Sequence, residues 1–403
     1  MLKRDIFGHK QRYESWKEDI KDSDIVGLTK KNSDIIKQHV FDMEIGVNIS
    51  MKNKKGARSY PRLNNIRQRL VQMTIMFQDR GIKDITELKE KQVIQFFSEM
   101  RSGIIKTKDG EIYRSVGDYA KMLTSFWHWW MKVNRKKGKH ILDIAEELDK
   151  SQTQTRFVYI TKEQLEEIMP YFNEDEQILL MFTFDSIIRA PTELLSLKVK
   201  DIFKREGIVW VNVPAEISKT HFERTFNLLY SGEAVWKYIE RQNLKPEDYL
   251  FNINHKNLTE KMQKVALQLF GDKLSNPKAG GKYGEIKLYD LRHSGAIHLR
   301  ILAQKTKKIS LDAIRQRGGW VDFKMLNHYT QFIGLDGSID KEDLLIEEDK
   351  SRLERDVEKL KKSDKKIAEG LRTFFEIMKN NPDSMNKLVK KDREKLVELF
   401  AMK

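Results

Sequence analysis

Apolar residues recur along the first third of the chain with the spacing of a helix. Between residues 63 and 130 they return every three or four positions, which places them on one buried face of successive helices. The repeating positions are Ile66, Leu70, Met73 and Phe77, then Ile94, Phe97 and Met100, then Tyr119, Leu123, Phe126 and Trp130. This pattern predicts a small all-helical domain.

A different period appears further along the chain. Residues 208–213 alternate as the residues of a strand do, and residues 224–229 supply a partner strand after a polar turn region. Thr161 and Gln164 have the spacing of a capping box, which predicts that a helix begins there. We therefore expect a second domain that is mostly helical and contains a small antiparallel β-sheet.

Polar and basic stretches predict where these parts join. The basic run 52–58 is typical of a loop, and the basic run 135–139 and the polar stretch 151–156 bracket a predicted interdomain linker. The predicted fold class is mainly α, in several domains. We expect an N-terminal helical or polar extension (1–58), a helical domain (59–150), the mostly helical domain with the small sheet (157–340) and a charged tail (341–403).

Two segments allow more than one interpretation. Apolar residues of the tail follow alternating steps of three and four from Leu353 to Met378, which fits either a coiled coil or a helix that packs on a neighbour. The aromatic residues between positions 126 and 130 could stack on nucleic-acid bases. Aromatic residues late in an amphipathic helix more often belong to a core, and we assign these to the core of the helical domain.

The charge composition indicates a possible binding partner. Lysine and arginine number 75 against 60 aspartate and glutamate, a formal net charge of +15. This excess makes nucleic acid the first partner to consider, although a generally lysine-rich composition would give the same number.

The chain has no cysteine, which excludes disulfides and thiolate chemistry. No apolar stretch approaches the roughly 20 residues that cross a bilayer, and the charged N-terminus lacks the apolar core of a signal peptide. We expect a cytoplasmic protein without membrane contact.

Two common kinds of site are not predicted. The glycine-rich stretch 280–284 lacks the Ser or Thr after its lysine and the glycine spacing of a phosphate-binding loop. His293 and His298 are five positions apart and face different sides of a helix, so they form no metal-ligand pair. We expect no cofactor and no metal.

Several cationic and aromatic residues lie in contexts that suit a reactive site. Arg189 ends an apolar helix, so its guanidinium is expected to be partly buried and to need an anionic partner. Glu193 could be that partner for purely structural reasons. Lys219 lies between the two predicted strands, where a lysine is usually only solvated.

The remaining candidates follow in chain order. Tyr289 and Arg292 are three positions apart near the start of a helix and share one face, so both could address one anion. Trp320 follows two glycines, and Tyr329 comes nine positions later. Each of these residues alone has an ordinary structural explanation, as a surface arginine or a packed aromatic ring. The ordered set of all six is much harder to explain by chance.

The ordered set resembles the tyrosine recombinases, and in particular the integrases of archaeal viruses, plasmids and integrated elements. The resemblance covers roughly residues 60–340 and implies that residues 59–150 are a core-binding domain and residues 157–340 the catalytic domain. It also implies a role for each candidate: Arg189 and Arg292 as phosphate-binding arginines, Lys219 as the hairpin lysine, Tyr289 and Trp320 as further site residues, and Tyr329 as the nucleophile. The family usually has histidine where Tyr289 stands, and an acid three rather than four positions after the first arginine.

The resemblance further implies a reaction and partners. Tyr329 would cleave double-stranded DNA at an attachment site through a 3′-phosphotyrosyl intermediate, without metal or ATP, to integrate or excise a mobile element. A homotetramer in the DNA synapse, an accessory directionality factor and a nucleoid-associated location are expected from the family. Two alternatives stay open: a DNA-relaxing enzyme similar to type IB topoisomerases, and an inactive DNA-binding protein with an architectural role.

Overall fold

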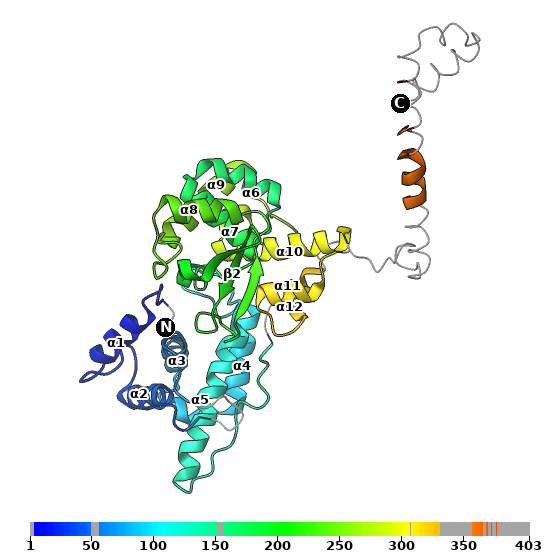
Figure 1. Ribbon diagram of the computed structural model, residues 1–403. Coiled ribbons are helices and arrows are strands. Elements are labelled where there is room, and N and C mark those ends of the chain that lie inside the picture. The colour runs from blue at the N-terminus through cyan, green and yellow to red at the C-terminus, as the bar shows by residue number, and fades with distance from the viewer. Residues whose placement is uncertain are drawn as a thin grey trace. The chain divides into compact units, whose positions relative to one another are not determined.

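The chain is mainly helical. The computed structural model describes residues 4–49, 56–151, 156–306 and 308–330, and in the tail residues 357–365, 368–369, 372 and 376. The tail from Leu335 onward forms a unit of its own. In the described part before it, twelve α-helices accompany one three-stranded sheet (Figure 1). The predicted fold class is confirmed.

The N-terminal helices share one apolar core. They are α1 (His9–Asp19), α2 (Lys30–Ile45), α3 (Tyr60–Gln78), α4 (Glu90–Ser102) and α5 (Val116–Lys136). Both α1 and α2 pack on α3, and α5 packs on α3 and α4. Buried residues of this core include Tyr13, Ile36, Val40, Leu70, Phe77, Phe96 and Leu123. Burial of these side chains is what holds the helices together, since isolated helices of this length are marginal in water.

The aromatic cluster late in α5 is part of this core. Phe126, Trp127 and Trp129 are at most 2% exposed. The indole N–H of Trp129 donates to Asp42 Oδ2 at 2.7 Å, so the polar end of the ring is also satisfied inside the protein. The assignment of these rings to the core, rather than to base stacking, is confirmed.

A second set of helices surrounds the sheet. They are α6 (Lys162–Ile168), α7 (Glu174–Ser186), α8 (Gly232–Arg241), α9 (His255–Phe270), α10 (Leu288–Thr306), α11 (Leu311–Gly318) and α12 (Lys324–Thr330). Short 3-10 turns are η1 (Ile85–Glu87), η2 (Met169–Tyr171), η3 (Leu194–Ser196), η4 (Val199–Asp201) and η5 (Tyr283–Glu285). The predicted capping box is present at α6: Thr161 Oγ1 accepts from the Gln164 N–H, and Gln164 Oε1 accepts from the Thr161 N–H at 3.0 Å.

The sheet is antiparallel, with β2 (Ile208–Val213) between β1 (Ile202–Arg205) and β3 (Arg224–Asn227). Val211 pairs with Ile202 on one side and Phe226 on the other. Both predicted strands are confirmed, although β3 ends at Asn227. The sequence did not predict β1, because only its first residue is buried and no alternation of apolar and polar side chains marks it.

Helix α10 packs along α7 (Figure 1). The two helices come close together at Gly295. A Cβ atom on Gly295 would lie 2.0 Å from the Phe184 carbonyl oxygen and 2.9 Å from the Ile187 side chain. Since real Cβ atoms do not approach a backbone oxygen that closely, only glycine permits this packing. This contact fixes two candidate site residues relative to each other, because Arg189 follows the end of α7 and Arg292 lies on α10.

Part of the tail is helical. Residues 357–365 are helical, in agreement with the predicted helical tail. Most of the apolar repeat between Leu353 and Met378 lies outside the described residues, as does much of the predicted loop 52–58 and of the polar stretch 151–156. Among the described helices, none is both long enough and apolar enough to span a membrane.

Substitution of Gly295 by alanine should destabilise the protein. The added methyl group forces α7 and α10 apart, and overpacking of this kind costs about 1–3 kcal/mol, more than the roughly 1 kcal/mol that alanine gains as a helix former. Urea denaturation followed by circular dichroism measures the change. Gly284→Ala is the control, because its Cβ would meet Leu267 at an ordinary 3.5 Å. Equal stability of Gly295→Ala and wild type would contradict the close packing of α7 and α10.

Candidate active site

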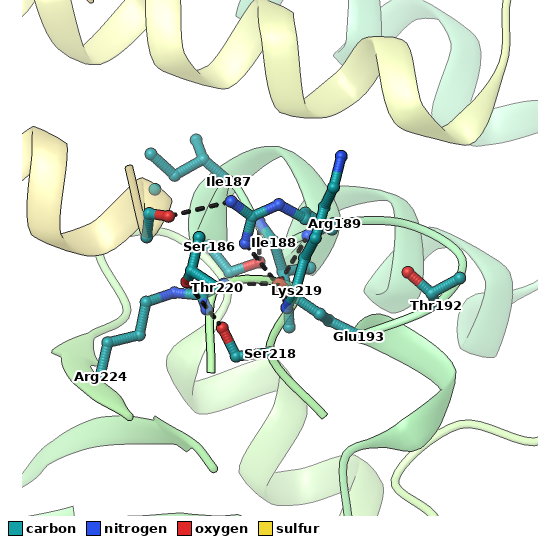
Figure 2. Close-up of polar contacts among 12 residues, drawn as sticks. Ser186, Ile187, Ile188, Arg189, Thr192, Glu193, Ser218, Lys219, Thr220 and Arg224 are labelled. Atoms are coloured by element: carbon teal, nitrogen blue, oxygen red, sulfur yellow. Dashed lines mark hydrogen bonds and ion pairs between the residues drawn. The ribbon is translucent and has the colours of Figure 1, made fainter. Parts of the chain in front are cut away.

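Arg189 is held in the interior by an abrupt end of α7. Ile187 adopts a left-handed conformation (φ 46°), which ends the helix and turns the chain inward. A β-branched residue in this conformation is strained by about 1–3 kcal/mol, a feature that often marks functional sites. Arg189 is 8% exposed, and its Nη1 donates to Glu193 Oε1 at 2.7 Å (Figure 2). The partner considered from the sequence is therefore the one observed.

Glu193 bonds more than one cation. Arg224 at the start of β3 donates through Nη2 to Glu193 Oε2 at 2.6 Å, and the backbone N–H of Arg189 donates to the same oxygen at 3.1 Å. Glu193 is fully buried. Burial alone would raise the pKa of this carboxyl, but Arg224 and Arg189 lower it to about 2. The carboxylate therefore stays ionised and fixes both guanidiniums.

Lys219 lies in the loop between β2 and β3, and its side chain is exposed. Its backbone N–H donates to Glu193 Oε1 at 3.3 Å, which brings the loop beside Arg189 (Figure 2). The prediction that Lys219 sits between two strands is confirmed. The contact with Glu193 joins Lys219 to Arg189 although 30 positions separate them in the sequence.

Arg292 is the most deeply buried cation of the site. It lies in the first turns of α10, is 1% exposed, and donates through Nη2 to the Gly318 carbonyl at 2.6 Å and through Nη1 to the Ile187 carbonyl. The ring of Trp320 lies 4.8 Å from its guanidinium carbon, a cation–π contact. Burial lowers the pKa of Arg292 to about 10, so it remains charged at neutral pH.

Tyr329 lies on α12 and is completely buried. Its hydroxyl is 2.7 Å from Nδ1 of His293, and its ring lies 5.8 Å from that of Trp320. Burial raises the pKa of Tyr329 above the ordinary value, and the positive charges of Arg292 and Arg189 act in the opposite direction. The phenol is therefore protonated at neutral pH, within the electrostatic field of two arginines.

Some of the predicted site residues lie in contact with one another, and others lie at the edge of the site. Arg292, Trp320 and Tyr329 are joined by ring and charge contacts, and Arg189 reaches the same turn by donating to the Gly319 carbonyl at 2.9 Å. Tyr289 lies at the edge of the site with 38% of its surface exposed. Its ring contacts His293 edge to face at 5.1 Å.

Sequence reasoning missed a second buried ion pair. Arg317 on α11 donates through Nη2 to Asp185 Oδ1 at 2.8 Å and through Nη1 to the Asn227 carbonyl at 2.7 Å. Asp185 also accepts the backbone N–H groups of residues 229–231. An acidic residue inside the apolar run of α7 was the available signal, because a buried carboxylate needs a cationic partner.

The sequence also provided no reason to assign a role to Arg224, which contacts Glu193, or to His293, which contacts Tyr329. Beside the site lies a pocket lined by Phe222 from the β2–β3 loop, by Arg224 at the start of β3, and by Trp320 and Val321 from the turn after α11. Among the described residues, no group of three or more histidine and acidic side chains is arranged to hold a metal ion.

The model of the phage integrase family matches residues 158–332, which include all the site residues named above. This segment belongs to the phage integrase family. The tyrosine recombinase class that the sequence predicted is confirmed for the integrase domain. No curated protein sequence matches the chain.

Solved structures share the fold of this chain at low sequence identity. The XerH site-specific recombinase in its post-cleavage complex with palindromic difH substrate aligns with a TM-score of 0.51 and 15% identity, over 68% of this chain and 78% of that chain. The Tn1549 transposon integrase (residues 82–397) in complex with circular intermediate DNA aligns with a TM-score of 0.50 and 13% identity, over 80% of this chain and 98% of that chain. These alignments show a common fold.

Replacement of Glu193 by glutamine should destabilise the integrase domain strongly. The variant leaves Arg189 and Arg224 buried without an anion, a change that typically costs about 3–5 kcal/mol. Because folding lowers the pKa of Glu193, its stabilisation is present above the ordinary carboxyl pKa of 4.5 and is lost as the pH falls toward 2. Urea denaturation at pH 7 and pH 3 should show a smaller difference between variant and wild type at pH 3.

The matched control is Glu247→Gln, which removes an exposed carboxylate that pairs with Lys198 and Lys200. Exposed pairs of this kind contribute little to stability, so this variant should unfold like the wild type at both pH values. An equal effect of the two substitutions would contradict the role of Glu193 as a buried counter-ion.

Proposed function

We propose that this integrase cleaves and rejoins DNA strands, with Tyr329 as the nucleophile that forms a 3′-phosphotyrosyl intermediate. One observation carries the proposal: the hydroxyl-bearing ring of Tyr329 and the guanidinium of Arg292 both pack on Trp320, with Arg189 bonded to the same turn. A potential nucleophile and two fixed cations therefore meet at one place.

The two arginines suit the charge that develops during phosphodiester cleavage. Attack on the phosphorus gives a pentacoordinate state with additional negative charge on the non-bridging oxygens, and guanidiniums bind such oxygens in bidentate fashion. Each guanidinium has five N–H donors, of which two are used in the bonds described for Arg292 and two in those for Arg189. The remaining donors can bind the phosphate. Loss of one preorganised donor of this kind typically costs about 3–4 kcal/mol of transition-state stabilisation.

The leaving group needs a proton, and Lys219 is our candidate for the general acid. Cleavage releases a 5′-oxygen that is a strong base unless it is protonated. The exposed side chain of Lys219 is anchored through its backbone to Glu193, beside Arg189. The phosphotyrosyl ester conserves the energy of the broken bond, so a 5′-hydroxyl can rejoin the strand without ATP. We assign Trp320 and Tyr289 to positioning of the phosphate.

The substrate is proposed to be duplex DNA at an attachment site of a mobile element that the enzyme integrates or excises. The net charge of +15 supports binding to the phosphate backbone, which should weaken steeply as salt concentration rises. Exchange of strands between two duplexes requires four cleavages, which supports a homotetramer in the synapse. An accessory directionality factor would bias integration against excision. We place the enzyme in the cytoplasm with the nucleoid, where its DNA substrate is.

A covalent adduct tests the nucleophile. The protein is incubated with nicked or suicide duplexes from the element that encodes it, without divalent metal, and the products are separated under denaturing conditions. We expect an adduct with the wild type and none with Tyr329→Phe, because the phenyl ring has no hydroxyl to attack phosphorus. Tyr230→Phe, which alters a tyrosine bonded to His298, is the control and should still form the adduct.

The outcomes separate the alternatives. Salt-sensitive DNA binding without an adduct on any of these substrates would contradict the proposal and favour an inactive DNA-binding protein. An adduct that leads to relaxation of supercoiled DNA but never to exchange between two duplexes would favour an activity similar to that of type IB topoisomerases.

A second substrate tests Lys219. We expect Lys219→Ala to slow single-turnover cleavage by about 10²- to 10⁴-fold, the usual contribution of a general acid. A duplex with sulfur in place of the 5′-bridging oxygen should restore most of this rate, because a thiolate leaves without protonation. Lys200→Ala, at a lysine paired with Glu247, is the control and should cleave both substrates like the wild type. No recovery with the sulfur substrate would contradict the role of Lys219 as the acid.

A further inference from the structure

His293 lies directly against the reactive atom of the proposed nucleophile. It follows Arg292 on α10, and its Nδ1 is 2.7 Å from the Tyr329 hydroxyl oxygen. The ring is fixed on two further sides, because it stacks on Phe157 with centroids 4.5 Å apart and meets the edge of Tyr289 at 5.1 Å. Only 9% of its surface is exposed. The imidazole is therefore preorganised toward one hydroxyl group.

The phenol of Tyr329 needs a base to become a nucleophile at neutral pH. Burial keeps it protonated, and complete burial also separates it from bulk water that could take the proton. Among the described side chains around it, Arg189, Arg292 and Trp320 only donate hydrogen bonds, and the phenol of Tyr289 is a much weaker base than an imidazole. Imidazole, in contrast, is the side-chain base whose ordinary pKa of about 6.5 lies closest to neutral pH.

We infer that His293 is the general base that accepts the proton of Tyr329 during cleavage, an inference that rests on the function proposed above. With Nδ1 unprotonated, the Tyr329 hydroxyl donates to it. The proton moves to Nδ1 as the phenolic oxygen forms its bond to phosphorus, and the bond from phosphorus to the 5′-oxygen breaks. The 5′-oxygen takes a separate proton from Lys219.

The charges of the site allow this transfer in both directions. An imidazolium beside Arg292 would be costly alone, but it forms together with the additional negative charge on the phosphoryl oxygens. During rejoining, the 5′-hydroxyl gives its proton back to Lys219 as its oxygen bonds to phosphorus, and the tyrosine oxygen leaves. His293 then returns the proton to that oxygen, so the same residue is the base in cleavage and the acid in rejoining.

A pair of substitutions distinguishes proton transfer from positioning. His293→Asn keeps a side-chain amide near the position of Nδ1, so it can hold the hydrogen bond to Tyr329, but it has no useful basicity. His293→Ala removes both the bond and the base. Both are assayed by single-turnover cleavage of suicide duplexes, beside wild type and Tyr329→Phe. Wild-type adduct formation that is lost in Tyr329→Phe establishes the proposed function first, so a failure of that function is recognised separately.

We expect His293→Asn to bind DNA like the wild type and to cleave about 10²- to 10⁴-fold more slowly, the usual contribution of a general base. The 5′-bridging sulfur substrate should not restore its rate, because the leaving group is not the defect. Cleavage by His293→Asn within about threefold of the wild type would overturn the inference, since positioning alone would then suffice. Recovery with the sulfur substrate would also overturn it, because His293 would then assist the leaving group.

A more acidic nucleophile provides a second readout that a structural role would not change. Tyr329 is replaced by 3,5-difluorotyrosine in both the wild type and His293→Asn. A more acidic phenol depends less on a base, so the difference in rate between the two proteins should shrink by roughly tenfold or more. An unchanged difference would contradict proton transfer to His293. If His293→Ala does not fold, the asparagine variant and this substitution still decide the matter.

Discussion

The integrase domain is organised by the need to pair arginine side chains that are almost completely removed from water. Transfer of such a cation to the interior costs several kcal/mol unless an anion or carbonyl oxygens receive its hydrogen bonds. Glu193 accepts hydrogen bonds from Arg189 and Arg224. Asp185 accepts one from Arg317, and a backbone carbonyl accepts one from Arg292. The buried arginines, each at most 8% exposed, are Arg189, Arg224, Arg292 and Arg317.

This network joins elements that are distant in sequence. It connects the end of α7, the β2–β3 loop, the start of α10 and the turn after α11, and these are the segments that carry the proposed catalytic residues. The network contains four guanidiniums but only two carboxylates, those of Glu193 and Asp185. It therefore carries an excess of two positive charges. The excess lies beside Tyr329, where a phosphodiester would bring negative charge. The bonds that stabilise the fold thus also create the field that the proposed reaction uses.

Parts of this arrangement could be predicted locally. The helical periodicity between residues 63 and 130 marks α3 to α5, and the Thr161 capping box marks the start of α6. Burial of the α5 aromatic residues and the partner of Arg189 also followed from local context, because an apolar face must be covered and a buried cation must be paired. Strand β1 could not be predicted, since it exists only through its hydrogen bonds to β2.

The sequence by itself determined the class of protein, through the resemblance carried by the order of Arg189, Lys219, Arg292 and Tyr329 along the chain, and it predicted the residue types of the proposed site. Only the tertiary structure decided which side chains meet. Arg189 bonds a carbonyl 130 positions away, and Tyr329 bonds His293 across 36 positions. No local period encodes such contacts, since they arise when packing of α7, α10, α11 and α12 brings these segments together and most buried polar groups then pair with a partner.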